Sequence, residues 1–230
     1  MKTKNKVLLI LTCMCLIVAT TVMATMAYLQ DTAEVVNTFT VGNVKLLLDE
    51  KAVNPDGTEI PGAARVTGNE YHLIPGLTYT KDPTVTVMKD SEECYVRMLV
   101  TLNRSQTQLD DIFGTGFLPQ NHVTGWESTV WECTNVDTTT NPAVVTYEFR
   151  YRDKNATGTE IYTCKKANGN VALDPLFDNF TVPGTLTGDK LAKLAETPEF
   201  EITVVAHAIQ AAGFTNEDDA WAEFVVQTQP

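Results

Sequence analysis

The sequence is poor in the residues that most often carry catalysis and metal binding. Its three histidines are His72, His122 and His207, and none belongs to an HExxH motif. A zincin-type peptidase therefore has no recognisable ligand set in this chain. No serine lies in a GxSxG motif, and Gly114-Thr115-Gly116 lacks the lysine of a phosphate loop. We therefore expect no catalytic residues, no cofactor and no metal site.

Cysteine is also scarce. Cys13 and Cys15 lie in the amino-terminal apolar run, which leaves Cys94, Cys133 and Cys164 for the rest of the chain. Three cysteines can form at most one disulfide, and their spacing fits no zinc motif. We interpret them as small, half-buried strand residues, and the alternative is a reactive or intermolecular thiol.

Basic residues are few relative to acidic ones. The 230 residues include 17 lysines and arginines against 29 aspartates and glutamates, a formal net charge of −12. Such a charge repels nucleic acid and anionic lipid, so we expect no nucleic-acid partner. Assembly of like-charged subunits should become easier in salt or at low pH. The acidic pairs lack the alternate-residue spacing of a calcium loop and fit a solvated surface.

The amino terminus has the pattern of a secretion signal. Lys2, Lys4 and Lys6 precede an apolar run over residues 7–22 that only threonines interrupt. This combination is typical of a signal peptide. The alternative is an uncleaved membrane anchor, because the run approaches the roughly 17–25 residues that a spanning helix needs.

Small residues mark a cleavage site directly after this run. Thr25 and Ala27 occupy the −3 and −1 positions of a signal-peptidase site. We therefore predict a signal helix within residues 1–27 and cleavage between Ala27 and Tyr28. Signal peptidase and the membrane would then be partners of the precursor alone.

Alternating apolar and polar residues predict β-strands along most of the remaining chain. Pro83 interrupts one pattern and predicts an edge strand or a bulge, because proline cannot donate to a ladder. Arg97 is expected on an outward face, and residues 158–164 are expected to form a hairpin with 145–151. The predicted strands cover residues 35–48, 77–87, 94–102, 126–136, 145–151, 158–164 and 200–208.

Helical spacing is rare by comparison. It predicts short helices at 106–113 and 186–194, and a carboxy-terminal helix whose Trp221, Phe224 and Val225 pack back onto the strands. Many short strands with few helices predict a mainly-β fold, an antiparallel β-sandwich of jelly-roll type. Trp126 and Trp131 are interpreted as core anchors, with stacking on sugars as the alternative.

Three stretches resemble one known family. Residues 27–50 (AYLQDTAEVVNTFTVGNVKLLLDE), Leu73–Leu77 with the strand pair that follows, and residues 200–214 (FEITVVAHAIQAAGF) are similar to the TasA/camelysin family of Gram-positive bacteria. The resemblance implies export through a dedicated signal peptidase, a jelly-roll sandwich, and a role as a biofilm-matrix fibre subunit or surface protein. Some members are described as metalloproteases, but this chain lacks the motif for that activity.

The predicted organisation is a signal peptide (1–27), a flexible segment (28–36) and a single β-sandwich domain (37–230). The flexible segment is a candidate donor strand, because an open sheet edge accepts a strand from a neighbour. A frayed terminus is the alternative. Subunit docking would involve Tyr28, Leu29, Val35 and Val36.

The sequence thus predicts a secreted structural subunit of an extracellular matrix or surface fibre. Its partners would be further copies of itself, bound head to tail, and other matrix proteins or the cell wall. A monomeric cell-surface adhesion or binding module is the alternative function, and a metallopeptidase is a third.

Overall fold

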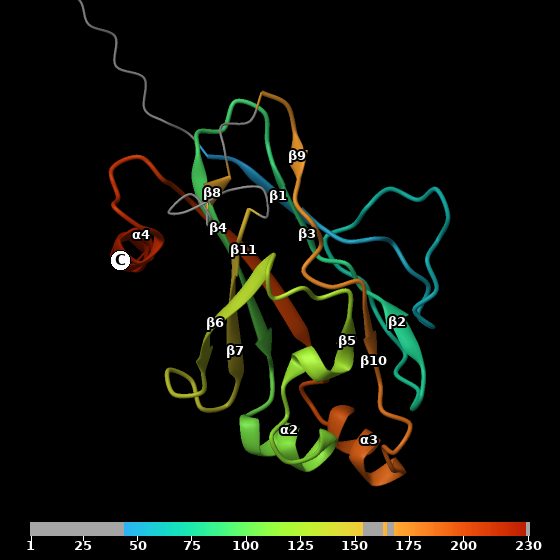
Figure 1. The fold of residues 1–230 in the computed structure, drawn as a ribbon. Coiled ribbons are helices and arrows are strands. Elements are labelled where there is room, and N and C mark those ends of the chain that lie inside the picture. Colours follow the sequence, from blue (N-terminus) through green and yellow to red (C-terminus); the bar gives the residue numbers. More distant parts are fainter. Residues whose placement is uncertain (1–43, 154–162, 165–167, 229–230) are drawn as a thin grey trace, which may run out of the picture. The chain divides into compact units, whose positions relative to one another are not determined.

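A computed structural model describes residues 44–153, 163–164 and 168–228, which belong to one compact unit, Gly42–Pro230. This part of the chain is mainly β, as predicted, and its strands form three antiparallel sheets (Figure 1). The predicted signal helix and donor segment lie outside the described residues. The strands are β1 (Leu46–Asp49), β2 (Thr78–Thr80), β3 (Thr84–Val87), β4 (Cys94–Leu102), β5 (Val123–Thr124), β6 (Trp131–Asp137), β7 (Val145–Tyr151), β8 (Thr163–Cys164), β9 (Val171–Ala172), β10 (Asn179–Thr181) and β11 (Ile202–Gln210).

The largest sheet is centred on β4. Its strand order is β11-β4-β7-β6, and β8 pairs with the part of β4 that β7 leaves free. The alternation predicted for 94–102 and 145–151 is confirmed, because Met98, Val100 and Tyr147 are buried on one face. Successive side chains of a strand point to opposite faces of the sheet, so the alternating sequence pattern determines which face packs into the core.

Two chain segments run antiparallel to each other through both smaller sheets: one contains β2 and β3, and the other contains β9 and β10. Strand β2 pairs with β10, and β3 pairs with β9, with the register shifted by one residue between them. Pro83 stands at the interruption, and Leu176 N donates to its carbonyl oxygen at 3.0 Å. The prediction of an edge strand or a bulge is thus confirmed: the register shifts at Pro83, and of the two strands that flank it β2 is an edge strand, whereas β3 lies between β1 and β9.

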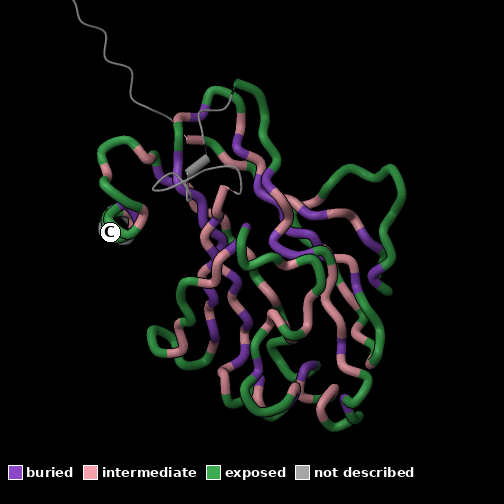
Figure 2. The backbone as a smooth tube through the Cα atoms, viewed as in Figure 1, coloured by how far each residue is buried: buried purple, intermediate pink, exposed green. Residues whose placement is uncertain are grey.

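One hydrophobic core joins side chains from the large sheet with side chains from β1, β3 and the β9–β10 connection. Figure 2 shows the buried stretches running along the central strands. Trp131 is fully buried and Trp126 packs against the same cluster, so both contribute to the core. Val44, Leu46 and Leu48 also pack against it, as their shared parity predicts.

The helices occur close to the predicted places. Helix α2 (Gln106–Phe113) has a capping box, in which Ser105 and Gln108 exchange side-chain to backbone hydrogen bonds. Helix α3 (Gly188–Leu194) and helix α4 (Glu217–Thr228) follow, together with a 3-10 turn, η1 (Pro119–His122). None of the helices in the described residues is long and apolar enough to cross a membrane.

Two predicted strands differ from the structure. The strand predicted from residue 126 begins at Trp131. The residues before it form a turn, in which Val130 N and Trp131 N both donate to Glu127 O. Strand β8 pairs with β4 rather than forming a hairpin with β7. The hairpin is impossible because β4 and β6 already occupy both edges of β7.

Candidate functional site

Strand β11 has one bonded edge and one outer edge. Asn103 N donates to Glu201 O at 3.2 Å, and Ala211 N donates to Glu93 O at 2.8 Å. Bonded residues alternate along an antiparallel pair, so odd-numbered residues of β11 bond to β4. The even-numbered residues therefore direct their backbone N–H and C=O groups to the outer edge: Ile202, Val204, Ala206, Ala208 and Gln210.

Among the described residues, no strand pairs with this outer edge. Strand β1 contacts β11 but pairs with β3 instead. The sequence of β11, ITVVAHAIQ, contains no proline and no lysine, arginine, aspartate or glutamate. Native edge strands normally carry such residues or bulges, which prevent pairing with another chain. The nine-residue edge of β11 has neither protection.

The other edge strands in the described part of the chain are short or guarded. Strand β6 carries Glu132 and Asp137, and its register shifts between Cys133 and Asn135. Strands β1, β2, β5 and β9 have four residues or fewer. Strand β11 is therefore the edge best suited to accept a further strand.

A cleft of about 410 Å³ lies at the start of β11. Four parts of the chain line it: residues 69–73, Lys81, Phe180 on β10, and residues 199–202. The Tyr71 and Phe180 rings meet edge to face with centroids 5.4 Å apart, and Tyr71 Oη donates to Thr80 O at 3.1 Å. Burial, followed by the charge of Glu50, raises the pKa of Tyr71.

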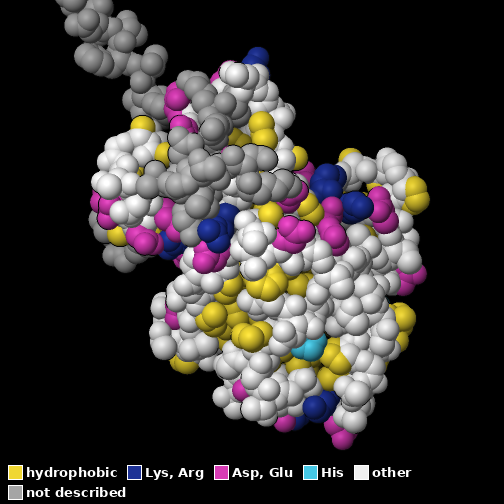
Figure 3. All heavy atoms as spheres, viewed as in Figure 1, with side chains coloured by type: hydrophobic (Ala, Val, Ile, Leu, Met, Phe, Trp, Pro, Cys, Tyr) yellow, Lys and Arg dark blue, Asp and Glu magenta, His cyan; other side chains and the backbone are white. Residues whose placement is uncertain are grey.

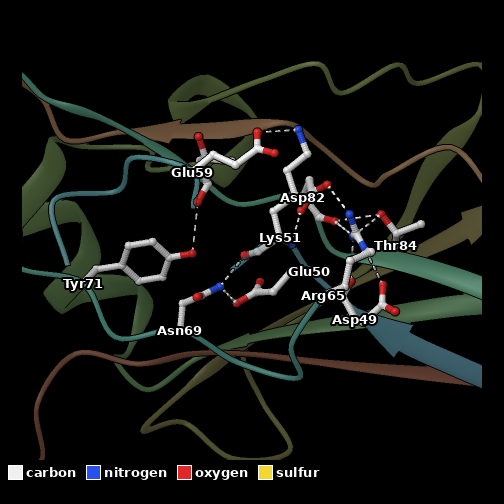
Figure 4. Close-up of polar contacts among 10 residues, drawn as sticks. Asp49, Glu50, Lys51, Glu59, Arg65, Asn69, Tyr71, Asp82 and Thr84 are labelled. Carbon is white, nitrogen blue, oxygen red and sulfur yellow. Dashed lines mark hydrogen bonds and ion pairs between the residues drawn. The ribbon is translucent and has the colours of Figure 1, made fainter. Parts of the chain in front are cut away.

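A largely buried ionic cluster adjoins this cleft through Lys81 and Asn69. Figure 4 shows polar contacts of Glu50, Asn69 and Arg65 in this cluster. Lys81 Nζ lies 2.6 Å from Glu50 Oε2, and these residues are only 8% and 4% exposed. Asn69 Nδ2 donates to Glu50 Oε1 at 2.8 Å, while Val53 N donates to Asn69 Oδ1 at 3.0 Å. These bonds hold Asn69 beside residues 50–53, which directly follow strand β1.

Arg65 extends the same cluster towards the surface. Its guanidinium contacts Asp49 at 2.5 Å and Asp82 at 2.8 Å, and it donates to Thr84 Oγ1 at 2.9 Å. Figure 3 shows Lys or Arg side chains beside Asp and Glu side chains at the right of the view, over the loop that follows β1. Every charge in this cluster has a partner, so its role is to fix the loop.

Helix α4 covers part of the opposite face of the large sheet. Arg97 was expected to face outward into solvent, but it is 6% exposed because α4 lies over it. Its guanidinium carbon is 4.3 Å from the Trp221 ring, and its Nη1 lies 3.3 Å from Glu148 Oε2. The expected packing of Trp221 and Phe224 is confirmed, while the side chain of Val225 lies outside the described residues.

A second arginine fastens the start of α4 to strand β7. Arg150 Nη1 lies 2.9 Å from Glu217 Oε1 and 2.6 Å from Asp218 Oδ1. Burial lowers the pKa of Arg150, but hydrogen bonds to Asp218, Glu148 and Glu217 outweigh that effect and raise it. Burial raises the pKa of Glu217, against the opposing effect of Arg150.

The three histidines occupy separate environments. His122 stacks on Phe117 with ring centroids 5.1 Å apart, and burial lowers its pKa. His207 Nδ1 accepts a hydrogen bond from Arg97 Nε at 3.3 Å. In the part of the chain that the structure describes, no group of three or more histidine, cysteine or acidic residues could hold a metal ion.

The cysteines lie on three strands. Cys94 is fully buried and Cys133 is half-buried, and both are free thiols. Cys164 lies directly opposite Cys94 in the β4–β8 ladder. The predicted cleavage residues, Ala27 and Tyr28, and the predicted docking residues Leu29, Val35 and Val36 lie outside the described residues.

Sequence reasoning identified the strand that forms the candidate edge, but not the edge itself or the cleft. The absence of charge in residues 202–210 is a sequence signal that could have identified the edge. The cleft has no such signal, because its walls come from four parts of the chain that only folding brings together.

Comparison with known proteins finds no match to a family model, to a curated protein or to a solved structure. The resemblance to the TasA/camelysin family therefore remains a prediction from sequence motifs.

Proposed function

We propose that this protein is a secreted structural subunit that assembles by β-strand addition into a matrix or surface fibre. The observation that carries the proposal is the outer edge of β11, which has no charged side chain and pairs with no strand among the described residues. An added strand would satisfy the outward N–H and C=O groups of five residues, which is the energetic basis of strand addition. Residues 28–36 of a neighbouring copy are the proposed donor, with Tyr28, Leu29, Val35 and Val36 as docking residues.

The proposed fold is a jelly-roll-type sandwich. One layer would contain strands β11, β4, β7 and β6. The other layer would contain the strands of the two smaller sheets, β1, β2, β3, β5, β9 and β10. Shared burial of side chains from both groups of strands supports this arrangement. Neighbouring strands that are far apart in sequence, such as β4 and β11, are typical of such folds.

A head-to-tail contact of this kind propagates, because each copy offers both a donor segment and an acceptor edge. We propose that export through a signal peptidase, with cleavage between Ala27 and Tyr28, frees the donor segment. The mature protein would then reside in the extracellular matrix or at the cell surface. Other matrix proteins or the cell wall would be further partners.

The acceptor edge can be tested with two neighbouring prolines. Ala206 directs its N–H outward, so Ala206→Pro removes no bond to β4 but blocks an added strand. Val205 donates to β4, so Val205→Pro should destabilise the fold by removing a ladder hydrogen bond. We expect exported Ala206→Pro protein to be folded but unable to form filaments in electron micrographs.

The donor segment can be tested in the same assay with Val35→Asp combined with Val36→Asp. Each variant alone should remain monomeric. A mixture of the donor variant and Ala206→Pro should stop at one-to-one dimers, because only one donor and one acceptor remain functional. Normal filaments from Ala206→Pro would contradict the proposal, and a wild-type protein that stays monomeric under all conditions would favour the adhesion module.

A further inference from the structure

The cleft at the start of β11 has a polar rim and an aromatic wall. Tyr71, Phe180 and Phe200 contribute the aromatic rings, and Leu73 and Ile202 add aliphatic surface. Its volume of about 410 Å³ lies within the range of roughly 300–1,000 Å³ that small-molecule sites occupy. The cleft is therefore large enough for a small organic ligand.

An apolar hollow of about 60 Å³ adjoins the cleft. The two spaces share five lining residues, Leu73, Lys81, Phe180, Phe200 and Ile202. A water-sized group occupies about 10–15 Å³ of such a volume, so the hollow has room for about four to six methylene groups.

The charge of the cleft selects the ligand. Glu70, Glu199 and Glu201 line it, and within the described residues none of their carboxylates forms an ion pair. The one cation among the lining residues, Lys81, is matched by Glu50 at 2.6 Å. The cleft therefore has an excess of negative charge around an aromatic wall, which favours an organic cation.

We propose that this cleft binds a primary alkylammonium ion with a stem of about five carbons. The ammonium group lies among Glu70, Glu199 and Glu201, and the stem passes between Phe180 and Phe200 into the apolar hollow. Burial of the stem supplies affinity, and the carboxylates supply charge selectivity. This proposal does not depend on strand addition and requires no second copy of the chain, although Ile202 belongs both to the cleft and to the outer edge of β11.

The test is calorimetric titration of the purified full chain with pentylammonium, methylammonium, pentan-1-ol and pentanoate. Pentylammonium should bind with one-to-one stoichiometry. Each methylene removed from the stem should weaken binding about fourfold, and methylammonium should give no measurable binding. Pentanol that binds as tightly as pentylammonium, tighter binding of pentanoate, or no saturable heat with pentylammonium would each overturn the proposal.

Variants then locate the site. Glu70→Gln, Glu199→Gln and Glu201→Gln should each weaken pentylammonium binding about threefold, while keeping the thermal unfolding transition of the parent protein. Glu223→Gln on α4 is the matched control and should bind like the parent. Unchanged affinity in all three cleft variants would place the ligand elsewhere and refute the assignment.

Discussion

At the scale of single residues, the buried pair of Glu50 and Lys81 is the clearest tertiary constraint in the described part of the chain. Both side chains are almost fully buried, and Asn69 satisfies the second carboxylate oxygen of Glu50. A buried charge that loses its partner is far more costly than an exposed one, because water cannot replace the lost contact. The position of the loop between β1 and β2 therefore depends on the side chains of Glu50, Lys81 and Asn69.

We expect Glu50→Gln to destabilise the protein by about 3–5 kcal/mol, because it leaves the Lys81 ammonium buried without a counter-charge. The matched control is Glu59→Gln, which removes an exposed ion pair with Lys51 and should change stability by less than about 1 kcal/mol. Urea denaturation measures both variants. Equal effects would show that the Glu50–Lys81 contact is solvated.

Gly57 offers a second test at this scale. Its φ is +80°, and an added Cβ would lie 2.4 Å from Tyr79 Cδ1 and 2.7 Å from Tyr79 Cα. Gly57→Ala should therefore cost about 2–4 kcal/mol, from backbone strain together with overpacking.

Gly62 has a similar φ of +76° but no atom within 4 Å of an added Cβ. Gly62→Ala should cost only about 1 kcal/mol, from the backbone conformation alone. Thermal unfolding of the two variants separates the two contributions. Similar unfolding temperatures for Gly57→Ala and Gly62→Ala would mean that Tyr79 moves away from the added methyl group at little energetic cost.

At the scale of elements, helix α4 and strand β11 depend on the same neighbours. His207 on β11 contacts Arg97 and lies 4.7 Å from the Phe224 ring of α4, measured between ring centroids. Arg97 in turn lies over Trp221. The helix therefore covers the carboxy-terminal part of β11 on one face of the sheet and leaves the strand's outer edge to other partners.

Burial and the nearby Arg97 charge lower the pKa of His207 below 6.5. A base with a lowered pKa in the folded state stabilises the fold above its unfolded pKa, and this contribution is lost as pH falls through the folded value. Stability should therefore decrease below pH 6.5, and His207→Gln should reduce that decrease. Glu217, whose pKa burial raises, acts in the opposite direction.

Urea denaturation of wild type and His207→Gln between pH 7.5 and pH 5 measures this difference, since Glu217 is common to both proteins. As pH falls, the free energy of unfolding of His207→Gln should increase relative to that of the wild type. Parallel pH profiles would show that the neutral form of His207 is not required.

At the scale of the whole molecule, charge opposes assembly. Without the three lysines of the predicted leader, 14 basic residues remain against 29 acidic ones. Copies of such a chain repel one another over the Debye length, which is about 30 Å at 0.01 M salt and about 10 Å at 0.1 M. Strand addition at β11 must overcome this repulsion.

We therefore expect the assembled fraction of exported protein to increase as salt is raised from about 0.01 M to 1 M, where the Debye length is about 3 Å. Light scattering of the wild-type protein, with Ala206→Pro as the control, measures this dependence. Scattering from the wild type that decreases with salt would show that attraction between charged groups, rather than strand pairing, drives assembly.

Local sequence patterns were sufficient to predict individual elements. Residues 94–102, 106–113 and 145–151 were predicted with the bounds that the structure shows, because alternation and helical spacing are properties of neighbouring residues. The mainly-β class follows from the same patterns. The poverty in histidine, cysteine and basic residues was likewise plain from the sequence.

Only the tertiary structure decided which strands and side chains meet. Glu50 and Lys81 are 31 residues apart, and Arg97 and His207 are 110 apart, so no local pattern could pair them. The burial of Arg97, the pairing of β8 with β4 and the open edge of β11 depend on which partners occupy each position. Local patterns specify the face that a residue presents, but long-range packing determines what covers that face.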